Sequence, residues 1–359
     1  MERIRLDHLT KVYGQHPVVS DFSLSVDAGQ FCVILGPSGS GKSTLINMIA
    51  GFIPPTSGEI YVDGKPTSGL APYQRELGMM FQGYALFPHL SVYENVAFPL
   101  RARGVPDKTS RERVEQALAM VELTAFERRL PDELSGGQQQ RTALARALVF
   151  GPRLLLMDEP LAALDRRLRE RMQSEIRAIQ RKLAITVLYI THDQQEAMTL
   201  ADVLVVMNRG RAEQVGAPLD LYHRPKTRFV SEFLGDTNLL QVTVESVSGE
   251  QVSCRTPNGD PIVVATSEPI AVGQQVTLAI RPEQVRFASG ETSGSNRFVG
   301  RISDVVDWGA SRRYHIEIPD AERAIVVMES GGSRTHVRQR GEEVAVSFES
   351  GDATLVVAS

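Results

Sequence analysis

Gly36-Pro37-Ser38-Gly39-Ser40-Gly41-Lys42-Ser43 is the stretch of this sequence that decides the fold. The octapeptide matches G-x-x-x-x-G-K-[ST], the pattern of a phosphate-binding loop. It follows an apolar run at residues 31–35 and precedes a helical stretch at residues 44–49. The pattern needs this order of strand, glycine loop and helix in order to bind a nucleotide, so we prefer it to a plain glycine-rich turn.

Each residue type in this loop has a physical role in binding phosphate. The glycines at positions 36, 39 and 41 lack a Cβ atom, so backbone N–H groups can close around phosphate oxygens. The positive end of the following helix faces the same anion. Lys42 can reach the β- and γ-phosphates, and the Ser43 hydroxyl can ligate Mg²⁺. We therefore predict ATP contacts from Gly36, Pro37, Ser38, Gly39, Ser40, Gly41, Lys42, Ser43 and Thr44.

Two adjacent carboxylates follow a second apolar run. Residues 154–157 are typical of a central parallel strand buried on both faces, and Asp158 and Glu159 come directly after them. Ligands of open α/β sheets bind at the carboxyl ends of the strands. An isolated Asp-Glu pair is usually a solvated loop, but the buried run before this pair favours function. We predict that Asp158 holds Mg²⁺ through water and that Glu159 orients and polarises the attacking water.

Two further segments carry a weaker signal when each is taken alone. Ser135-Gly136-Gly137-Gln138 opens a helix that Ser135 can cap, so this helix start is either a plain capped end or a second anion site. Because the chain already has one phosphate loop, a second anion site would serve the nucleotide of a partner subunit. His192 ends an apolar strand at residues 187–191, where it is either structural or in contact with the γ-phosphate.

Together these segments resemble the ATP-binding cassette (ABC) ATPases, the motor subunits of ABC transporters. The resemblance covers residues 1 to about 235, and the LSGGQ pentapeptide at 134–138 is close to diagnostic of the family. It implies an α/β P-loop NTPase fold with a helical subdomain, with ATP and Mg²⁺ as ligands. It also implies a homodimer around two ATP molecules, in which residues 135–138 of one subunit contact the ATP of the other. Lys42, Glu159 and His192 are the catalytic residues that the resemblance implies.

The same resemblance adds three assignments. Gln82, in Met-Met-Phe-Gln, matches the glutamine that senses Mg²⁺ and the attacking water. Tyr13 matches the aromatic residue that stacks on adenine, although a tyrosine could also simply fill a turn here. Asp165 matches the D-loop residue at the dimer interface, and Ala162 stands where the family often has serine.

Length and composition allow two domains in the reducing environment of a cytoplasm. The chain has 359 residues and a formal net charge of −4, which gives no reason to expect nucleic acid as a partner. Its two cysteines, Cys32 and Cys254, are too few for a disulfide framework, and Cys32 is expected in the core. The amino terminus has no apolar signal core, and no stretch approaches the roughly 18 apolar residues that span a bilayer. A channel would therefore be another chain.

The pattern changes near residue 235. Before it, the amphipathic stretches 111–121 and 166–182 predict helices, and residues 203–207 predict a strand. After it, short alternating runs at 242–244, 275–280, 314–318 and 343–348 predict a small all-β domain. With Ile280-Arg281-Pro282-Glu283, this part resembles the OB-like domain of importer ATPases.

OB folds often bind nucleic acid, but the charge of this part argues against that use here. Residues 236–359 contain 11 Arg, no Lys and 17 acidic residues, a net charge of −6, whereas nucleic-acid modules usually carry the opposite sign. We expect Trp308 in the core rather than as a stacking platform. We predict domains at 1–235 and 236–359, the second regulatory or dimer-forming.

The function predicted is therefore the ATP-hydrolysing subunit of a bacterial ABC importer, a translocase. Its partners would be two transmembrane permease subunits and, through them, a periplasmic or extracellular substrate-binding protein, with no nucleic acid. It would lie peripherally on the cytoplasmic face of the inner membrane. The aromatic segment 82–90 either borders the groove for a permease helix, as in import-type members, or is a buried turn.

The substrate is predicted less directly, because an ATPase subunit does not touch it. Residues 229–239 and 308–310 are most similar to the ATPases of spermidine/putrescine importers, with ferric-iron, sugar and phosphonate importers as alternatives. A soluble ABC ATPase of DNA repair or translation is the alternative from another class. The absence of sustained heptads and the single phosphate loop disfavour it.

Overall fold

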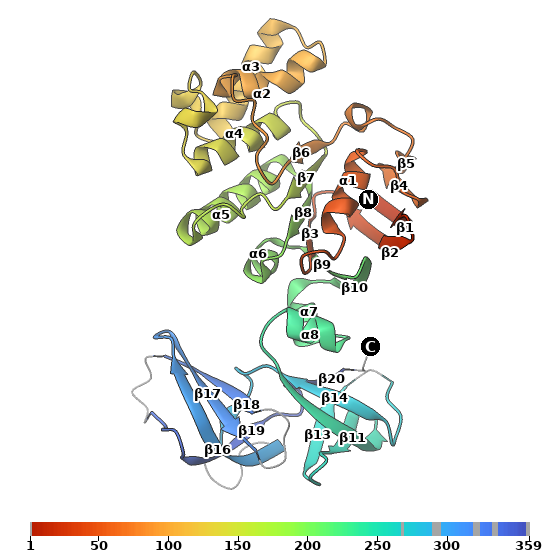
Figure 1. Cartoon of the computed structure of the whole chain (residues 1–359), viewed down its shortest axis with the longest axis vertical. Coiled ribbons are helices and arrows are strands. Elements are labelled where there is room, and N and C mark those ends of the chain that lie inside the picture. The colour runs from red at the N-terminus through yellow and green to blue at the C-terminus, as the bar shows by residue number, and fades with distance from the viewer. Residues whose placement is uncertain (1, 267–268, 289–295, 319–323, 332–336, 357–359) are drawn as a thin grey trace. The chain divides into compact units, whose positions relative to one another are not determined.

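The computed structural model describes residues 2–266, 269–288, 296–318, 324–331 and 337–356. The chain divides into two compact units, an N-terminal unit, Met1–Pro218, and a C-terminal unit, Leu219–Ser359. Figure 1 shows helices α1 to α6 in the first unit, and the short helices α7 and α8 with two β-sheets in the second unit. Each unit is described by itself below.

A six-stranded sheet forms the centre of the N-terminal unit. Its order is β10-β9-β3-β8-β7-β6, with β10 the antiparallel strand at one edge. All residues of β3 and β8 are buried, as expected for parallel strands covered on both faces. The strands are β3 (Phe31–Leu35), β6 (Gly78–Met80), β7 (Leu154–Asp158), β8 (Thr186–Thr191), β9 (Val203–Asn208) and β10 (Arg211–Gly216).

This sheet confirms the strands predicted at 31–35, 154–157, 187–191 and 203–207. Because β3 pairs with β8 and β8 with β7, all in parallel, their carboxyl ends lie side by side. The phosphate loop follows β3, the carboxylate pair ends β7 and His192 follows β8. The sheet order therefore brings three motifs to one edge, where ligands of such sheets bind.

A second, antiparallel sheet covers the helix that follows the phosphate loop. Its order is β2-β1-β4-β5, from β1 (Glu2–Tyr13), β2 (His16–Asp27), β4 (Ser57–Val62) and β5 (Lys65–Pro66). Alternate residues of β2, such as Phe22, Leu24 and Val26, are buried. They share one apolar core with α1 (Lys42–Ala50), which begins two residues before the predicted helical stretch.

Of the remaining helices of this unit, α2, α4, α5 and α6 begin at capping side chains, whereas α3 follows Pro106. Ser91 and Glu94 form a reciprocal capping box at α2, and Ser135 caps α4 in the same way. The helix predicted at 166–182 lies within α5, and the one predicted at 111–121 lies in α3 except for its last residue, Val121, which caps that helix. The elements are α2 (Val92–Ala102), α3 (Asp107–Met120), α4 (Gly136–Leu148), α5 (Arg166–Leu183) and α6 (Gln194–Leu200), with 3-10 turns at Pro72–Gln74, Thr124–Phe126 and Pro131–Glu133.

No helix in the described ranges is long and apolar enough to cross a membrane.

The described strands of the C-terminal unit form two antiparallel five-stranded sheets around one shared apolar core, which confirms the all-β prediction. The first has the order β13-β12-β11-β14-β20 and the second β15-β19-β16-β17-β18. Two short helices, α7 (Pro218–His223) and α8 (Arg228–Phe233), precede them. The strands are β11 (Asn238–Ser248), β12 (Gln251–Arg255), β13 (Pro261–Ala265), β14 (Gln275–Ile280), β15 (Arg286–Phe287), β16 (Asn296–Asp307), β17 (Ser311–Glu317), β18 (Ile325–Ser330), β19 (Glu343–Phe348) and β20 (Ala353–Val356).

Arg281 explains the Ile-Arg-Pro-Glu motif. Its side chain is buried and donates hydrogen bonds of 2.9–3.2 Å to the backbone carbonyls of Tyr222, Ser231, Gly235 and Asp236. Its guanidinium also lies 4.0 Å from the centre of the Tyr222 ring. Burial lowers the pKa of Arg281, but a guanidinium stays charged in proteins. Arg281, which directly follows β14, thus connects α7, α8 and the turn after α8 to the first sheet of this unit.

Trp308 departs from the prediction that it lies in the core. It is 58% exposed, in the turn between β16 and β17. The Arg313 guanidinium lies 4.2 Å from its ring centre, so a cation rather than an apolar core covers one face of the indole. Cys32, by contrast, is fully buried as expected.

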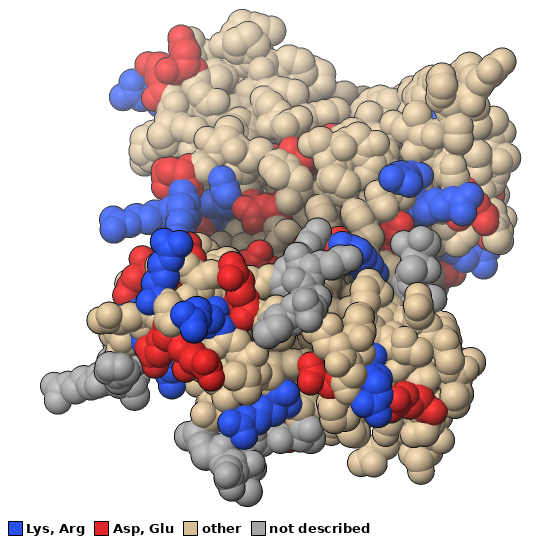
Figure 2. Space-filling view, turned by 60° about the horizontal axis from the view of Figure 1, so that its bottom comes forward, with Lys and Arg blue, Asp and Glu red and all other residues tan. Residues whose placement is uncertain are grey.

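Charge is mixed on the one face of the molecule that Figure 2 draws. On the face drawn in Figure 2, basic and acidic side chains alternate in small groups and do not gather into one basic patch.

Candidate functional site

Glu159 lies at the centre of the site formed at the carboxyl edge of the six-stranded sheet. Its Oε1 is 3.2 Å from His192 Nδ1, and its Oε2 accepts a hydrogen bond of 3.3 Å from Gln82 Nε2. Its own N–H donates to the carbonyl of Ile190 at 3.0 Å. Side chains from three segments of the chain therefore meet at one carboxylate.

The phosphate loop has backbone positions that only glycine fits. A Cβ on Gly36 would lie 2.3 Å from the Met207 carbonyl oxygen. Gly41 has a φ of +102° and a Cβ there would lie 2.5 Å from the Val18 carbonyl oxygen. The carbonyl of Ser40 accepts a 2.9 Å hydrogen bond from the N–H of Gly210, so the loop is also fastened from outside. Close backbone packing, and not flexibility, is what these glycines provide.

Lys42 lies inside the curve of the loop. Its Nζ donates hydrogen bonds to the carbonyls of Gly36 at 2.8 Å and Pro37 at 2.9 Å. Burial lowers the pKa of Lys42, while the negative charges of Glu159 and Asp158 act against that shift. Burial also raises the pKa of Asp158, with a further contribution from Glu159 and an opposing one from Lys42. A cation and two carboxylates are thus held together in a partly dehydrated place.

Ser43 and Thr44 follow in the first turn of α1, where Ser43 is exposed and Thr44 half-buried. Within the described residues, no group of three or more His, Cys, Asp or Glu side chains could hold a metal ion by itself. The oxygens of Ser43 and Asp158 suit Mg²⁺, which usually takes one or two protein ligands together with waters and substrate phosphates. This donor set fits Mg²⁺ only in company with a nucleotide.

The signature residues form a capped helix start. Ser135 Oγ accepts from the N–H of Gln138 at 3.4 Å, and Gln138 Oε1 accepts from the N–H of Ser135 at 2.9 Å. Gly136 is exposed, whereas Gly137 packs on α5, where an added Cβ would lie 3.2 Å from Leu168 Cδ2. No hydrogen bond in the described part of the chain joins residues 135–138 to the phosphate loop. The signature residues were predicted to contact the ATP of a partner subunit, and that prediction stays untested.

Two other predicted residues lie at element ends. Tyr13 closes β1 and is 49% exposed, with Lys11 Nζ 5.2 Å from the centre of its ring, so one aromatic face is open to a flat ligand. Asp165 caps α5, its Oδ1 accepting from the N–H of Leu168 at 3.0 Å. Neither contact conflicts with the assignment made from the sequence, and neither tests it.

Sequence reasoning missed an arginine that joins two of the motifs. Arg169, in the first turn of α5, donates to Asp193 Oδ2 at 2.9 Å and to the carbonyl of Leu164 at 3.0 Å. Its Nε is 3.7 Å from Glu196 Oε1. Arg169 thus ties the turn before Asp165 to the residue after His192. The only signal in the sequence was an arginine four positions after Asp165.

Glu196 is the buried end of this arrangement. It accepts hydrogen bonds from Tyr189 Oη at 2.9 Å and Thr191 Oγ1 at 2.7 Å. Burial raises the pKa of Glu196, and these two hydrogen bonds act in the opposite direction. Because Tyr189 and Thr191 lie on β8, the carboxylate fastens the start of α6 to the strand that ends before His192.

Arg146 is a second residue that the sequence did not point to. It donates 2.6 Å hydrogen bonds to the carbonyls of Tyr84 and Ala85, and so connects α4 with the segment after Gln82. Tyr84 is buried while Phe81 is 36% exposed, so the 82–90 segment and its surroundings are partly turn and partly surface.

Comparison with known proteins agrees with this architecture. Residues 19–162 match the ABC transporter family model, and residues 278–356 match the TOBE domain model. The spermidine/putrescine import ATP-binding protein PotA of Rubrobacter xylanophilus is 46% identical over 348 residues, which cover 96% of this chain and 91% of that protein. The protein of the same name from Pseudomonas aeruginosa strain UCBPP-PA14 is 42% identical over 348 residues, 96% of each chain.

Solved structures give the same fold for the N-terminal part. A dimeric ATP-binding cassette in a post-hydrolysis state, bound to ADP and Pi, is 33% identical with a TM-score of 0.54, covering 60% of this chain and 98% of that one. CbiO1 from Clostridium perfringens, part of the cbiONQ transporter complex, is 30% identical with a TM-score of 0.58, covering 62% and 91%. The chain is therefore an ATP-binding cassette ATPase.

More narrowly, it belongs to the family of import ATP-binding proteins whose members were compared above. The predictions of a P-loop cassette followed by an OB-like β-domain, and of an ATP-hydrolysing transport subunit, are confirmed. This membership excludes the DNA-repair and translation alternatives.

Proposed function

We propose that this chain hydrolyses ATP to drive the uptake of a polyamine, spermidine or putrescine, through separate permease subunits. The observation that carries the ATPase part is the Glu159 carboxylate, held between Gln82 and His192 at the sheet edge where the phosphate loop also lies. The substrate rests on the relatives, which are named for spermidine and putrescine import and match nearly the whole chain. Importers of ferric iron, sugars or phosphonates are the alternatives.

The residues of one subunit divide the chemistry as follows. Lys42 and the backbone N–H groups of the loop bind the β- and γ-phosphates, and Tyr13 stacks on adenine. Glu159 orients the attacking water and accepts its proton, while His192 donates a hydrogen bond to the γ-phosphate. When Mg²⁺ is bound, held by Ser43, Gln82 and Asp158, it neutralises charge on the phosphate oxygens.

The signature residues act on the other subunit of a homodimer. Ser135, Gly136, Gly137 and Gln138 place the amino end of α4 against the γ-phosphate of the partner's ATP, where backbone N–H groups and the helix dipole favour an anion. Asp165 lies at that interface. Support comes from the geometry above, since the hydrogen bonds of Ser135 and Gln138 among the described residues lie within their own helix α4.

We propose two permease subunits as further partners, and through them a periplasmic or extracellular binding protein. The chain then lies peripherally on the cytoplasmic face of the inner membrane. The mixed surface charge and the net charge of −6 in residues 236–359 favour no nucleic-acid partner. We propose 1–235 as the nucleotide-binding domain and 236–359 as the regulatory or dimer-forming domain, although α7 and α8 pack with the latter.

The test is transport by the complete complex. The chain, the permease subunits encoded beside it and their binding protein are reconstituted in liposomes, and uptake of labelled putrescine and spermidine is measured with and without enclosed ATP. We expect ATP-dependent polyamine uptake that unlabelled spermidine competes and maltose, ferric iron or a phosphonate does not. If one of those three compounds alone competed, that compound and not a polyamine would be the substrate. Uptake that did not depend on ATP would overturn the ATPase assignment.

A further inference from the structure

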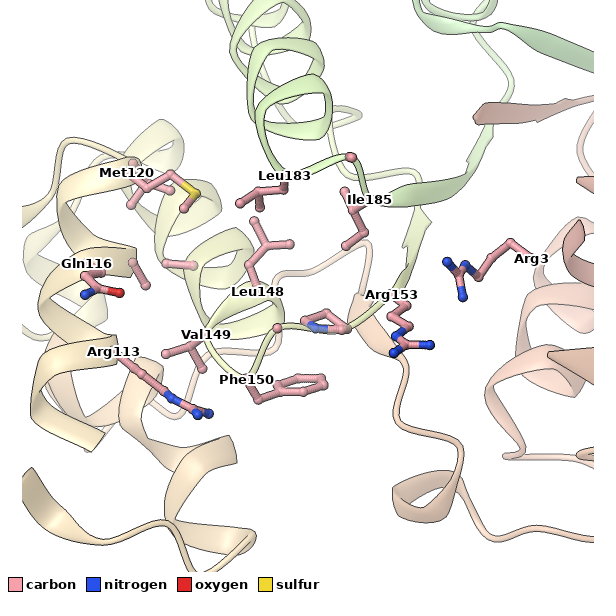
Figure 3. Close-up of a pocket in the computed structure, with 16 residues that line it drawn as sticks. Arg3, Arg113, Gln116, Met120, Leu148, Val149, Phe150, Arg153, Leu183 and Ile185 are labelled. Carbon is pink, nitrogen blue, oxygen red and sulfur yellow. The ribbon is translucent and has the colours of Figure 1, made fainter. Parts of the chain in front are cut away.

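The N-terminal unit has a cavity of about 510 Å³ that is separate from the nucleotide motifs. Figure 3 shows where its walls meet: α3 on one side, the end of α4 with residues 149–153, and the turn from α5 into β8. Because β7 begins at Leu154 and β8 at Thr186, this is the amino edge of the sheet. None of its lining residues belongs to the phosphate loop, the signature, the carboxylate pair or the switch histidine.

One part of the surface of this cavity is apolar. The side chains that form it are Met120, Leu148, Val149, Phe150, Leu183 and Ile185. Leu183 is 41% exposed. An apolar ligand that covered this side chain would remove apolar surface from water, which is favourable. A hollow of this size, lined by apolar side chains together with a few converging polar groups, is of the kind that holds small molecules.

The charged groups around this surface are cationic, and Gln116 adds a neutral amide. Arg113 and Arg153 stand on opposite sides of Phe150 in Figure 3, Arg3 is beside Arg153, and no acidic residue lines the cavity. Arg3 and Arg153 share a single carboxylate, that of Asp63, with Arg153 Nη1 3.5 Å from Asp63 Oδ2.

Two further arginines, Arg113 and Arg103, add positive charge at this rim. Arg113 is exposed and makes no ion pair with any described residue. The Arg103 guanidinium lies 3.9 Å from the ring centre of Phe150, so the aromatic wall carries a cation too. The rim therefore keeps an excess of positive charge around an apolar floor.

We propose that this cavity binds an amphipathic anion, a carboxylate, sulfonate or phosphate carried on an apolar body. The apolar body lies against Leu148, Leu183 and Phe150, and the anionic group pairs with Arg113 or Arg153. Arg113, which makes no ion pair with a described residue, and Arg153, which shares one carboxylate with Arg3, can each give a charge-assisted hydrogen bond to such a group. A polyamine, which is cationic, is rejected by the same rim, so this site is distinct from any that handles the transported cargo.

The probe is 8-anilinonaphthalene-1-sulfonate, whose fluorescence rises in an apolar site, titrated into the full-length protein with a non-hydrolysable ATP analogue present throughout. We expect saturable binding that Arg113→Gln and Arg153→Gln each weaken about fivefold to tenfold. Arg113→Lys, which keeps the charge, should lose less. The matched control is Arg128→Gln, a change at a side chain that is 94% exposed and outside the cavity, which should bind as the unaltered protein does.

Competition identifies the class of ligand. Decanoate should displace the probe, whereas decyltrimethylammonium and spermidine at equal concentration should not. Equal binding of the unaltered protein and both glutamine variants, or equal displacement by the decyl cation, would overturn the proposal and leave an apolar patch only. Displacement by phosphatidylglycerol vesicles and not by decanoate below its critical micelle concentration would also overturn it, in favour of a lipid surface. Circular dichroism checks that each variant is folded.

Discussion

At the scale of single residues, Glu159 combines an unusual backbone conformation with a central chemical position. Its φ is +43°, in the left-handed region that non-glycine residues seldom adopt and that costs about 1 kcal/mol or more. The hydrogen bond from its N–H to Ile190 holds this turn at the end of β7. The turn directs the carboxylate to Gln82 and His192. The strained backbone conformation at Glu159 thus orients its carboxylate toward Gln82 and His192.

Glu159→Gln should keep ATP binding and remove turnover. The amide has the same shape but cannot accept a proton from the attacking water, so we expect the ATPase rate of the reconstituted complex to fall by about a hundredfold or more. Affinity for a fluorescent ATP analogue should stay within about twofold. Glu170→Gln, at an exposed carboxylate on α5, is the control and should hydrolyse ATP normally. Near-normal turnover of the Glu159 variant would remove this residue from the mechanism.

Asp158→Asn should raise thermal stability at neutral pH while weakening Mg²⁺-dependent ATP binding. Burial raises the pKa of Asp158, so the folded protein holds this proton more tightly than the unfolded chain, where aspartate titrates near about 3.9. The unaltered protein therefore loses stability as the pH rises from about 3.9 through the raised pKa of Asp158. Asparagine carries no charge at this position and so removes the loss. In this variant Lys42 keeps its attraction to Glu159, which raises the pKa of Lys42 more than the attraction to Asp158 does.

The measurement for Asp158→Asn is a series of thermal melts between pH 4.5 and 7.5. We expect the variant to melt higher at pH 7.5, by the order of 1–3 °C, with a gap that narrows toward acid. Asp132→Asn, which removes one exposed carboxylate, controls for net charge and should show no such trend. If the melting temperature of the variant minus that of the unaltered protein grew toward acid pH, the surroundings of Asp158 would favour its charged form, which would contradict the prediction.

At the scale of elements, continuous patterns were predictable and convergent contacts were not. The strands β3, β7 and β8 and the helix α5 each follow from a run of neighbouring residues, so the sequence alone predicted them and placed Lys42, Glu159 and His192 at one edge. Arg169 reaches Leu164, Asp193 and Glu196, and these meet only because of how α5 and α6 pack. Trp308 was predicted wrongly because a nearby arginine, invisible in local pattern, covers its ring.

Arg169→Ala should lower the kcat of ATP hydrolysis by about tenfold with KM within about twofold, because a small displacement of His192 costs rate more than binding. Arg169→Lys should recover part of the loss, since an ammonium can still reach Asp193. Arg167→Ala, at an exposed arginine of the same helix turn, is the control. A variant with raised KM, lower melting temperature and no recovery with lysine would show a structural role only.

At the scale of the whole molecule, the proposed nucleotide site is complete only in a dimer. Ser135→Arg should therefore leave nucleotide binding within a subunit unchanged within about twofold and block closure, because a bulky cation at the start of α4 collides with the partner's γ-phosphate site. In the Glu159→Gln background, ATP should drive dimerisation on a sizing column, and the added Ser135→Arg should abolish it. Ser174→Arg, at an exposed serine of α5, should not. A dimer that survives Ser135→Arg would contradict the composite site.

Removal of the C-terminal unit should leave ATP binding intact, because every nucleotide motif precedes residue 210. Two truncations distinguish the possible boundaries. A chain of residues 1–235 keeps α7 and α8 but loses Arg281, which leaves the carbonyls of Tyr222 and Ser231 without their donor. A chain of residues 1–218 ends where the compact unit ends, so we expect it to be the more stable of the two.

Circular dichroism establishes first that each truncated chain is folded. ATP affinity is then compared with that of the full-length protein, and we expect agreement within about twofold. Dimerisation in the Glu159→Gln background should be weaker if the β-domains contact each other, and the ATPase rate of the assembled complex should lose any response to regulators. A folded 1–218 chain that no longer binds ATP would make the C-terminal unit part of the nucleotide site, and the separation of catalysis from regulation along this chain would be wrong.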